Sequence, residues 1–398
     1  MKKILFHSHS NSIGGAELSL LETIKFMKNQ GHRIYLTLPH SSRTDYFNLV
    51  QPYCEAIILV KPMKFYSSAA QKNTLLGSVR NYFYSAYKSG WHILPVVKIY
   101  LFLKRHKIDI VHSNTCFSID GALAAKLARK PHILHIREIT GNGVGSTLKL
   151  YFQGTAFFKN LMSLLCTKII CNSHYTFNAS KIDFPESKMI VLYNPIKEQT
   201  HSTSERVSAT KVFGCVANLT ARWKNHELAI RLLKNLQDQN PDKQLQLVFF
   251  GSLPVQTDDY LLSLKNLIKQ LGVEDHVKFK GSIPQDSIYS QIDFLIHPAP
   301  FEPFGRVIIE AMVNRVPVIG INAGGAGELI TDGITGLLIS PEISQSEIEK
   351  VSYVINNKEV RNQMVSSALA FSRNFKPEII LTQLEQIYLS LNSSNLAH

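Results

Sequence analysis

The sequence lacks the features of secreted and membrane-spanning chains. Its five cysteines are odd in number and show no C-x-x-C spacing. This argues against a disulfide framework and a zinc site, and it suits a reducing cytoplasm. The amino terminus, MKKILFHSHS, has an apolar run of only three residues, whereas a secretory signal needs about 7–15. No stretch of about 18 uninterrupted apolar residues is present, so we expect no transmembrane helix.

Acidic residues are missing from the span 56–108, which holds nine basic and nine aromatic residues. The whole chain carries a net charge of +13. Basic residues interleaved with Tyr, Trp and Phe suit an anionic membrane surface, so we expect peripheral membrane contact here. The main alternative is a solvated basic face over ordinary core aromatics. Nucleic-acid binding is disfavoured, because no nucleic-acid motif accompanies the charge. The expected location is the cytoplasm, at the inner face of the cell membrane.

The length of 398 residues is too great for one core of usual size and fits two domains. Residues 3–7 predict a strand, residues 12–17 a Gly turn, and residues 18–31 a helix that closes at Gly31. This order implies a parallel, doubly wound sheet. After Asn194-Pro195 the sequence becomes polar, and the strand–helix alternation then starts again. We therefore predict an α/β protein with Rossmann-like domains at 1–195 and 196–374, followed by an amphipathic tail helix.

The most informative stretch is 296–328, IHPAPFEPFGRVIIEAMVNRVPVIGINAGGAGE. A loop ends in Pro303-Phe304-Gly305, and residues 306–313 have helix period. A helix start after a strand is a ready anion site, because its backbone N–H groups are free. Glu302 lies in the loop, and Glu310 lies roughly 6 Å deeper along the helix axis than Arg306. A nucleotide diphosphate sugar could touch both carboxylates while its diphosphate sits at the helix start.

This stretch resembles a known family. Pro298, the segment 302–305, the segment 310–312, the segment 317–319, and Gly324-Gly325 with Glu328 match the retaining glycosyltransferases of family four. The alternative is an ordinary βαβ unit with two incidental acidic residues. The resemblance implies the GT-B fold, in which two Rossmann-like domains face each other across a cleft. It also implies that the second domain holds the donor, the first holds the acceptor, and the tail helix 375–398 crosses back onto the first domain.

The resemblance assigns the donor contacts. Family members carry an Arg and then a Lys that face the phosphates; Lys224 matches the lysine, and Arg222 is the candidate for the arginine, whose usual position is nearer Asn218. Glu310 is expected to accept hydrogen bonds from the ribose hydroxyls. The Gly14-Gly15 turn is expected to approach the diphosphate or the acceptor, although Gly pairs also make plain turns. The predicted donor-binding residues are Arg222, Lys224, Phe304, Gly305, Arg306, Glu310, Gly14, Gly15, Gly325 and Glu328.

The predicted catalytic residues are Glu302, His135, Arg137 and Glu138. Glu302 is expected beside the transferred sugar, with its role open between positioning and charge stabilisation. Many relatives end the strand 132–137 in His-Asp; Arg137-Glu138 occupy that place here, and His135 lies two residues before on the same strand face. A buried structural His135 is the alternative. His7, His9 and His112 also end strands, but their spacing is no recognised ligand pattern, so we expect no metal and no other cofactor.

The resemblance predicts a hexosyltransferase that retains the anomeric configuration. It would move a sugar from a nucleotide-diphosphate donor to a glycan or lipid-linked acceptor, in bacterial surface polysaccharide biosynthesis. Two alternatives stay open. A GT-B nucleotide-sugar epimerase would form an epimerised nucleotide sugar without any acceptor. A non-catalytic nucleotide-sugar-binding subunit would bind nucleotide and transfer nothing.

Overall fold

The structure is a computed structural model, and it describes residues 1–40, 45–62, 66–67, 93–140, 149–150, 154–197 and 208–391. The chain divides by its internal contacts into two compact units. The first unit consists of Met1–Pro195 together with Pro377–His398, and the second consists of Ile196–Lys376. The amino-terminal and carboxy-terminal parts of the chain therefore belong to the same unit.

A seven-stranded parallel sheet in the order β3-β2-β1-β5-β6-β8-β9 forms the centre of the first unit. Its strands are β1 (Lys3–His7), β2 (Arg33–Pro39), β3 (Ala56–Val60), β5 (Ile110–Ser113), β6 (His132–Ile136), β8 (Lys168–Cys171) and β9 (Met189–Val191). A short antiparallel pair joins β4 (Tyr66–Ser67) to β7 (Lys149–Leu150). The strand order runs outward in both directions from β1 and β5. Their carboxyl ends are therefore the topological switch point, at which doubly wound sheets bind ligands.

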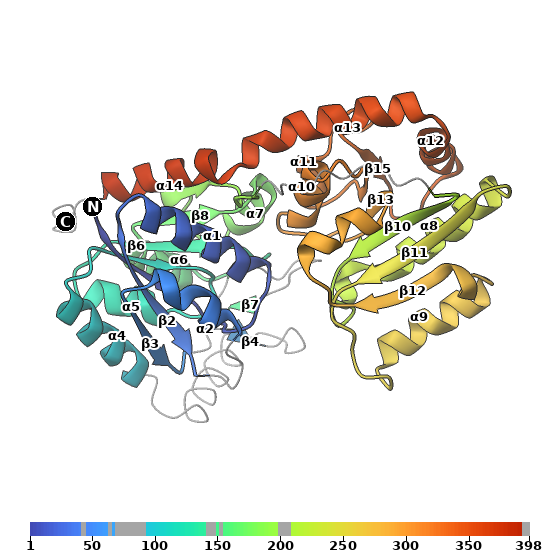
Figure 1. Ribbon diagram of the computed structural model, residues 1–398. Coiled ribbons are helices and arrows are strands. Elements are labelled where there is room, and N and C mark those ends of the chain that lie inside the picture. The colour runs from blue at the N-terminus through green and yellow to red at the C-terminus, as the bar shows by residue number, and fades with distance from the viewer. Residues whose placement is uncertain are drawn as a thin grey trace. The chain divides into compact units, whose positions relative to one another are not determined.

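Helices cover both faces of this sheet. α1 (Gly15–Asn29), α2 (Asp45–Val50) and α14 (Pro377–Ser390) share an apolar core with Phe6 of β1. Leu5 points the opposite way, as alternation along a strand requires, and packs with α4 (Ile93–His106) and α5 (Asp120–Leu127). α6 (Ala156–Leu165) extends this second layer, and α7 (His174–Ser180) follows β8. Figure 1 shows α4 next to α5.

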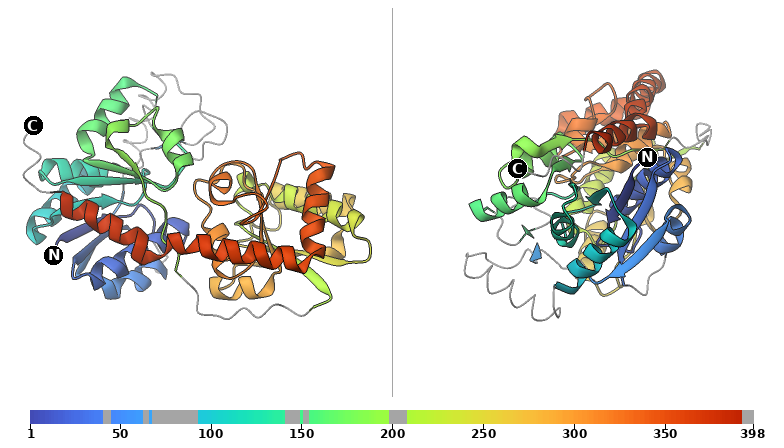
Figure 2. Two further views of the ribbon diagram at one scale, coloured as in Figure 1. Left: turned by 90° about the horizontal axis from the view of Figure 1, so that it is seen from above. Right: turned by 90° about the vertical axis from the view of Figure 1, so that its left-hand side faces the viewer.

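α14 brings the end of the chain into the first core. Four of its side chains are buried there, and α14 contacts α1, as Figures 1 and 2 show. These side chains are Ile380, Leu381, Leu384 and Tyr388. The sequence predicted a tail helix from residue 375, but the helix begins at Pro377, after the 3-10 turn η7 (Arg373–Phe375) of the second unit. Proline explains this start, because it fits the first helical turn and disfavours helix in the residue before it.

The second unit is built on a six-stranded parallel sheet in the order β12-β11-β10-β13-β14-β15. The strands are β10 (Thr210–Val216), β11 (Gln244–Phe250), β12 (Val277–Gly281), β13 (Phe294–His297), β14 (Val318–Ile321) and β15 (Leu337–Ile339). The helices are α8 (His226–Gln239), α9 (Asp259–Gln270), α10 (Arg306–Val313), α11 (Ala326–Leu329), α12 (Gln345–Asn356) and α13 (Lys358–Ser372). The order diverges from β10 and β13, so the carboxyl ends of these two strands are the switch point. The predicted doubly wound architecture is confirmed in both units.

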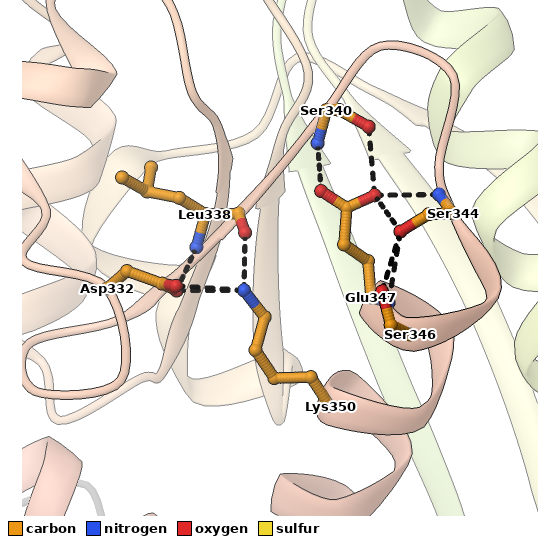
Figure 3. A network of polar contacts seen from close by, with 7 residues as sticks. All are labelled: Asp332, Leu338, Ser340, Ser344, Ser346, Glu347 and Lys350. Carbon is orange, nitrogen blue, oxygen red and sulfur yellow. Dashed lines mark hydrogen bonds and ion pairs between the residues drawn. The ribbon is translucent and has the colours of Figure 1, made fainter.

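The edge strand β15 was not predicted from the sequence, and a polar network ties it to α12 (Figure 3). The Lys350 ammonium lies 2.9 Å from Asp332 Oδ2 and donates to the Leu338 carbonyl at 2.8 Å, while the Leu338 N–H donates to Asp332 Oδ1 at 2.8 Å. The Glu347 carboxylate accepts from the backbone N–H groups of Ser340 and Ser344 at 2.6 and 2.7 Å. These bonds anchor β15 on both sides.

Candidate active site

The loop after β13 leads directly into α10. Gly305 is the N-cap of this helix and has a φ of +92°. A Cβ at this position would also lie 2.9 Å from Ile308 Cδ1, so glycine is required for both reasons. α10 begins at Arg306, as the sequence predicts, and its first-turn N–H groups face the end of the loop. This start lies at the carboxyl-end edge of the sheet, beside the switch point.

The loop carries Glu302, whose carboxylate is paired with Lys224. The Lys224 ammonium donates a hydrogen bond to Glu302 Oε2, and His297 Nε2 lies 3.6 Å from the same oxygen. Burial raises the pKa of the Glu302 carboxyl, but the charges of Lys224 and His297 and the Lys224 hydrogen bond outweigh it, so the pKa lies below its usual value. Burial lowers the pKa of His297 to about 4. At neutral pH the site therefore holds an ionised carboxylate, a cation and a neutral imidazole.

Glu310 is buried in α10, and two protein groups hold its carboxylate. Arg306 Nη2 lies 3.2 Å from Oε1, and the Tyr289 hydroxyl donates to Oε2 at 2.9 Å. Burial, with Glu310 beside it, raises the pKa of Tyr289 well above its usual value, so the hydroxyl stays protonated and remains a donor. Each carboxylate oxygen has a second lone pair, so Glu310 can still accept from a ligand. Arg306, predicted as a donor-binding residue, is engaged here by Glu310.

The two predicted cations of the loop after β10 have different partners. Arg222 and Lys224 lie in the 3-10 turn η3 (Arg222–Lys224), which leads into α8. Lys224 reaches Glu302, and its ammonium lies 4.1 Å from the centre of the Trp223 ring. The Arg222 guanidinium instead lies 5.4 Å from the centre of the Tyr260 ring in α9. The structure therefore brings Lys224, but not Arg222, to the glutamate.

The Gly324-Gly325 turn packs against the backbone of the Glu302 loop. Gly324 has a φ of +59°, and a Cβ there would lie 3.0 Å from the Glu302 nitrogen. A Cβ on Gly325 would lie 2.5 Å from the Phe304 carbonyl oxygen, and the Gly325 N–H donates to the Glu302 carbonyl at 2.8 Å. Both glycines are thus needed for this close approach. Glu328 follows in α11 and is partly exposed.

In the first unit, His135 and Arg137 lie together at the end of β6. Arg137 Nη2 is 3.3 Å from His135 Nδ1, so the expected common strand face is present. Arg137 Nε also donates to the Asn114 Oδ1 at 3.1 Å, and Nη1 donates to Asn194 Oδ1. Burial lowers the pKa of His135 well below its usual value, and Arg137 adds to this effect. The pair is therefore a neutral imidazole held by a buried guanidinium group.

Glu138 is separated from this pair. Its Oε2 accepts from Cys116 Sγ at 3.3 Å and from the Arg137 backbone N–H at 3.2 Å. Burial raises the pKa of Glu138 to about 7, although Cys116 and Arg137 oppose the rise. Of the three residues predicted in this segment, the side chains of His135 and Arg137 meet, and the Glu138 carboxylate is bound by Cys116 in the loop after β5.

The Gly14-Gly15 turn begins α1, with Gly14 as its N-cap. A Cβ on Gly14 would lie 2.9 Å from Glu17 Oε2, so the buried Glu17 carboxylate folds back over the turn. Burial raises the pKa of Glu17, while its own backbone N–H and Arg137 lower it. The sequence predicted residues 12–17 as a Gly turn, and no role was predicted for Glu17. Its signal was an acidic residue in the first turn of a helix.

The sequence also did not predict two residues that contact the glutamates of the second unit, His297 and Tyr289. His297 could have been noticed, because it ends the strand that precedes the Glu302 loop. Tyr289 left no such signal, since it lies 21 residues before Glu310 in the 3-10 turn η6 (Tyr289–Gln291). Only folding brings its hydroxyl to the carboxylate.

The strand-end histidines bond to hydroxyl groups. His7 Nδ1 lies 2.5 Å from Thr37 Oγ1, His9 Nδ1 lies 2.7 Å from Thr115 Oγ1, and His112 Nδ1 lies 2.6 Å from the Tyr388 hydroxyl. Within the described ranges, no group of three or more His, Cys, Asp and Glu side chains is placed to hold a metal ion.

Parts of the predicted membrane-contact span 56–108 are described, and they include β3, β4 and α4. This helix buries Val96, Ile99 and Leu103 against the sheet. Its other side exposes 63% of Ile93 and 59% of Leu101, with three basic side chains also in solvent. Residues 63–65 and 68–92 of the span lie outside the described residues. Across the part of the chain that the structure describes, no helix has the length and apolar character needed to cross a membrane.

Solved structures with the same architecture are glycosyltransferases and related proteins. Anabaena HepE, in complex with UDP and glucose, superimposes with a TM-score of 0.75 at 24% identity, over 98% of this chain and 100% of HepE. The pneumococcal O-GlcNAc transferase GtfA, in complex with UDP and GlcNAc, gives a TM-score of 0.69 at 12% identity, over 100% and 99% of the two chains. The predicted GT-B architecture is thereby confirmed: the fold is that of the GT-B glycosyltransferases.

Two family profiles cover most of the chain. The profile described as Glycosyltransferase Family 4 matches residues 13–200, and Glycosyl transferases group 1 matches residues 197–370. The chain belongs to family four of the glycosyltransferases. An uncharacterised glycosyltransferase of Methanocaldococcus jannaschii is 27% identical over 315 residues, 78% of this chain and 81% of that protein. The N-acetyl-alpha-D-glucosaminyl L-malate synthase of Bacillus anthracis is 24% identical over 306 residues, 72% and 75% of the two chains.

Proposed function

We propose that this glycosyltransferase moves a hexosyl group from a nucleotide-diphosphate sugar to a hydroxyl of a glycan or lipid-linked acceptor, with retention at the anomeric carbon, in bacterial surface polysaccharide assembly. The observation that carries the proposal is the Lys224–Glu302 pair at the start of α10, with Glu310 further along the same helix. This arrangement offers a cation, the N–H groups of a helix start and two carboxylates in one loop and helix. The similarity to HepE, which was solved with UDP-glucose, supports the choice of donor.

The leaving diphosphate would be stabilised from the second unit. When the bond from the anomeric carbon to the diphosphate oxygen breaks, negative charge develops on that oxygen. Preorganised N–H groups at Phe304, Gly305 and Arg306 and the Lys224 ammonium are suited to stabilise this charge. The acceptor oxygen would form its bond on the face that the diphosphate leaves, and the departing phosphate oxygen would take the acceptor proton. No protein base is then required.

Glu302 would act on the sugar rather than on the phosphates. Its carboxylate is ionised and held by Lys224, so it can stabilise positive charge at the anomeric centre or accept from a sugar hydroxyl. Glu310 would hold the ribose hydroxyls through the lone pairs that Arg306 and Tyr289 leave available. The close packing of Gly325 against Phe304 supports a role for Gly325 and Glu328 as the wall of the donor site.

The acceptor would bind on the first unit. The buried Arg137, together with His135, supplies positive charge and polar atoms at the end of β6, beside the switch point of that sheet. The Gly14-Gly15 turn at the start of α1 would approach the acceptor or the diphosphate through its backbone, with the Glu17 carboxylate beside it. Glu138 would remain protonated for part of the time at neutral pH, because burial brings its pKa to about 7. We assign the reaction no metal requirement, and transfer should therefore persist in EDTA.

The acceptor would lie at a membrane that the protein contacts through residues 56–108. Support comes from α4, which exposes apolar side chains alongside Lys98, Lys104 and Arg105. Reversing these three charges should abolish binding to vesicles of anionic lipid at low salt. The matched control reverses three exposed lysines of the second unit, Lys243, Lys265 and Lys269. Equal binding by both triple variants would overturn the membrane proposal.

A panel of UDP-, GDP-, ADP- and dTDP-sugars tests the donor. A bound donor raises the free energy of unfolding by RT ln(1 + [L]/Kd), so it raises the melting temperature. The stabilising donor is then incubated with glycan and lipid-linked acceptors, and the anomeric configuration of the product is read by NMR. Transfer with retention supports the proposal. An epimerised nucleotide sugar formed without acceptor, or binding with no transfer at all, would replace it by one of the two alternatives.

A further inference from the structure

A polar cavity lies at the amino-terminal ends of strands in the second sheet, whereas the α10 site lies at their carboxyl-terminal ends. Its volume is about 240 Å³, just below the range of about 300–1,000 Å³ typical of pockets for drug-sized ligands. Its lining comes from the amino ends of β10 and β13, from the residues after α10 and from the first turn of α13. Glu302, by contrast, follows the carboxyl end of β13. The cavity is therefore separate from the proposed donor site and suits a smaller ligand.

The charged residues that line this cavity carry a net positive charge, with three basic side chains and one acidic. Lys211, Arg315 and Arg361 contribute to it, and the acidic residue among the lining groups is Asp293, which lies 3.8 Å from the Lys211 ammonium. Within the described chain, Arg315 forms no ion pair, and its side chain is exposed. Ser290 and Asn362 add neutral hydrogen-bonding groups. A guanidinium group with hydroxyl and amide neighbours is suited to bind a phosphate group.

The backbone at Arg315 determines which substitution can test this position. Arg315 follows the C-cap of α10 and has a φ of +59°. Glycine is the residue that most easily adopts this conformation after a helix. Lys107 and Arg129 adopt a similar conformation after α4 and α5. Replacing Arg315 by glycine would therefore remove a guanidinium group from the cavity lining.

We propose that this cavity binds the phosphate group of a small phosphorylated sugar or of free phosphate. Arg315 would hold the phosphate oxygens, and Arg361 and Lys211 would add positive charge. Tyr289 also lines the cavity, and its hydroxyl donates to Glu310. The occupant would therefore lie behind the residue that supports the proposed ribose-binding carboxylate. The binding site itself does not depend on the proposed function.

The variant Arg315→Gly tests the site with little risk to folding. Glycine relieves the positive φ, so the variant should fold while losing the guanidinium group. Arg129→Gly is a matched control, because Arg129 is also exposed, follows α5 in the first unit and has a φ of +53°. Both variants lose one positive charge. They differ in that only Arg315 lines the cavity.

The experiment measures the melting temperature of the full chain with glucose 6-phosphate, inorganic phosphate or glucose, at constant ionic strength. We expect a rise of about 3 °C with at least one phosphate compound in the wild type and in Arg129→Gly. Arg315→Gly should bind at least about tenfold more weakly. A response to both phosphate compounds identifies free phosphate as sufficient, whereas a response to glucose 6-phosphate alone identifies a phosphorylated sugar.

Two results would overturn the proposal. One is the absence of any rise in the wild type. The other is an equal rise in Arg315→Gly and Arg129→Gly, which would mean that phosphate binds adventitiously or at the start of α10. Lys224→Ala separates these sites further, because it should keep the rise if the cavity holds the ligand. Neither negative result affects the donor panel, so this proposal can fail while the proposed transferase function stands.

Discussion

Single residues of the α10 site have separable tasks. Glu310 is held by Arg306 and Tyr289 and is assigned to the ribose, whereas Glu302 is held by Lys224 and is assigned to the sugar. Glu310→Ala should therefore weaken donor binding about 10- to 150-fold, the range for losing one hydrogen bond to a charged group. Glu302→Ala should mainly lower kcat. Steady-state kinetics with the stabilising donor measures both effects. Wild-type rates in both variants would refute the site assignment.

Tyr289 offers a finer test of the same carboxylate. Tyr289→Phe removes the hydroxyl that donates to Glu310 Oε2 and keeps the buried ring. The loss should raise KM for the donor several-fold and leave kcat nearly unchanged, because the carboxylate loses its orientation but not its charge. Tyr46→Phe is the control, since the Tyr46 hydroxyl is buried in the first unit without a hydrogen-bond partner in the described chain. A similar KM increase in both variants would contradict the role of Tyr289.

The ionisation of Glu302 predicts a dependence of stability on pH. The folded-state pKa of this carboxyl lies below its ordinary value of 4.5. Its contribution to stability should therefore be fully present above about pH 5 and should be lost as pH falls through the folded-state pKa. The readout is the melting temperature of the wild type minus that of Glu302→Gln between pH 3 and 7. A difference that does not change with pH would contradict this prediction.

Sequence reasoning predicted Glu302, Gly305 and Glu310 as donor-side residues because these three positions are close to one another in the chain. Glu302, Gly305 and Glu310 fall in one loop and one helix, where spacing alone determines which groups can meet. Contacts made across the fold were not accessible in this way. Tyr289 reaches Glu310 from a separate turn, and Arg222 turns to Tyr260 of α9 instead of to the glutamate. The Glu138 carboxylate likewise contacts Cys116, which lies in the loop after the neighbouring strand β5.

At the scale of elements, the α12 cap holds the edge of the second sheet. Ser344 is the N-cap of α12 and forms a capping box with Glu347, which also accepts from Ser340 of the segment after β15 (Figure 3). Ser344→Ala should cost about 1 kcal/mol of stability, which corresponds to about 2–4 °C in melting temperature. Ser346→Ala in the same turn is the control. Hydrogen exchange should increase in β15 of the first variant only.

The pattern of elements was largely predictable, and the failures have physical causes. Five strands of the second sheet are apolar runs between helices, and each was found. β15 has only three residues, Leu337–Ile339, and follows a turn that contains Gly333 and Gly336, so it has no period to detect. Its place in the sheet depends on pairing with β14 and on the Lys350–Asp332 contacts. Such long-range contacts leave no local pattern.

At the scale of the whole molecule, we expect the donor to bind mainly to the second unit and to stabilise that unit. The residues assigned to the nucleotide and the sugar all belong to Ile196–Lys376, apart from the Gly14-Gly15 turn. Saturating donor should therefore reduce hydrogen exchange most in η3, α10 and α11, and least in α4–α6. Mass spectrometry of peptides from the full chain measures this. Protection that is strongest in α4–α6 would place the donor on the first unit and refute the assignment.

The return of α14 to the first unit has a consequence for synthesis on the ribosome. Ile380, Leu384 and Tyr388 complete the core around α1, yet they are translated only after the entire second unit. At about 5–20 residues per second, the first unit waits on the order of ten seconds or more with part of its apolar surface uncovered. A fragment that ends at Pro195 should therefore aggregate, and a peptide with the α14 sequence should restore its solubility. The core around α1 is therefore completed by residues that are synthesised long after α1 itself.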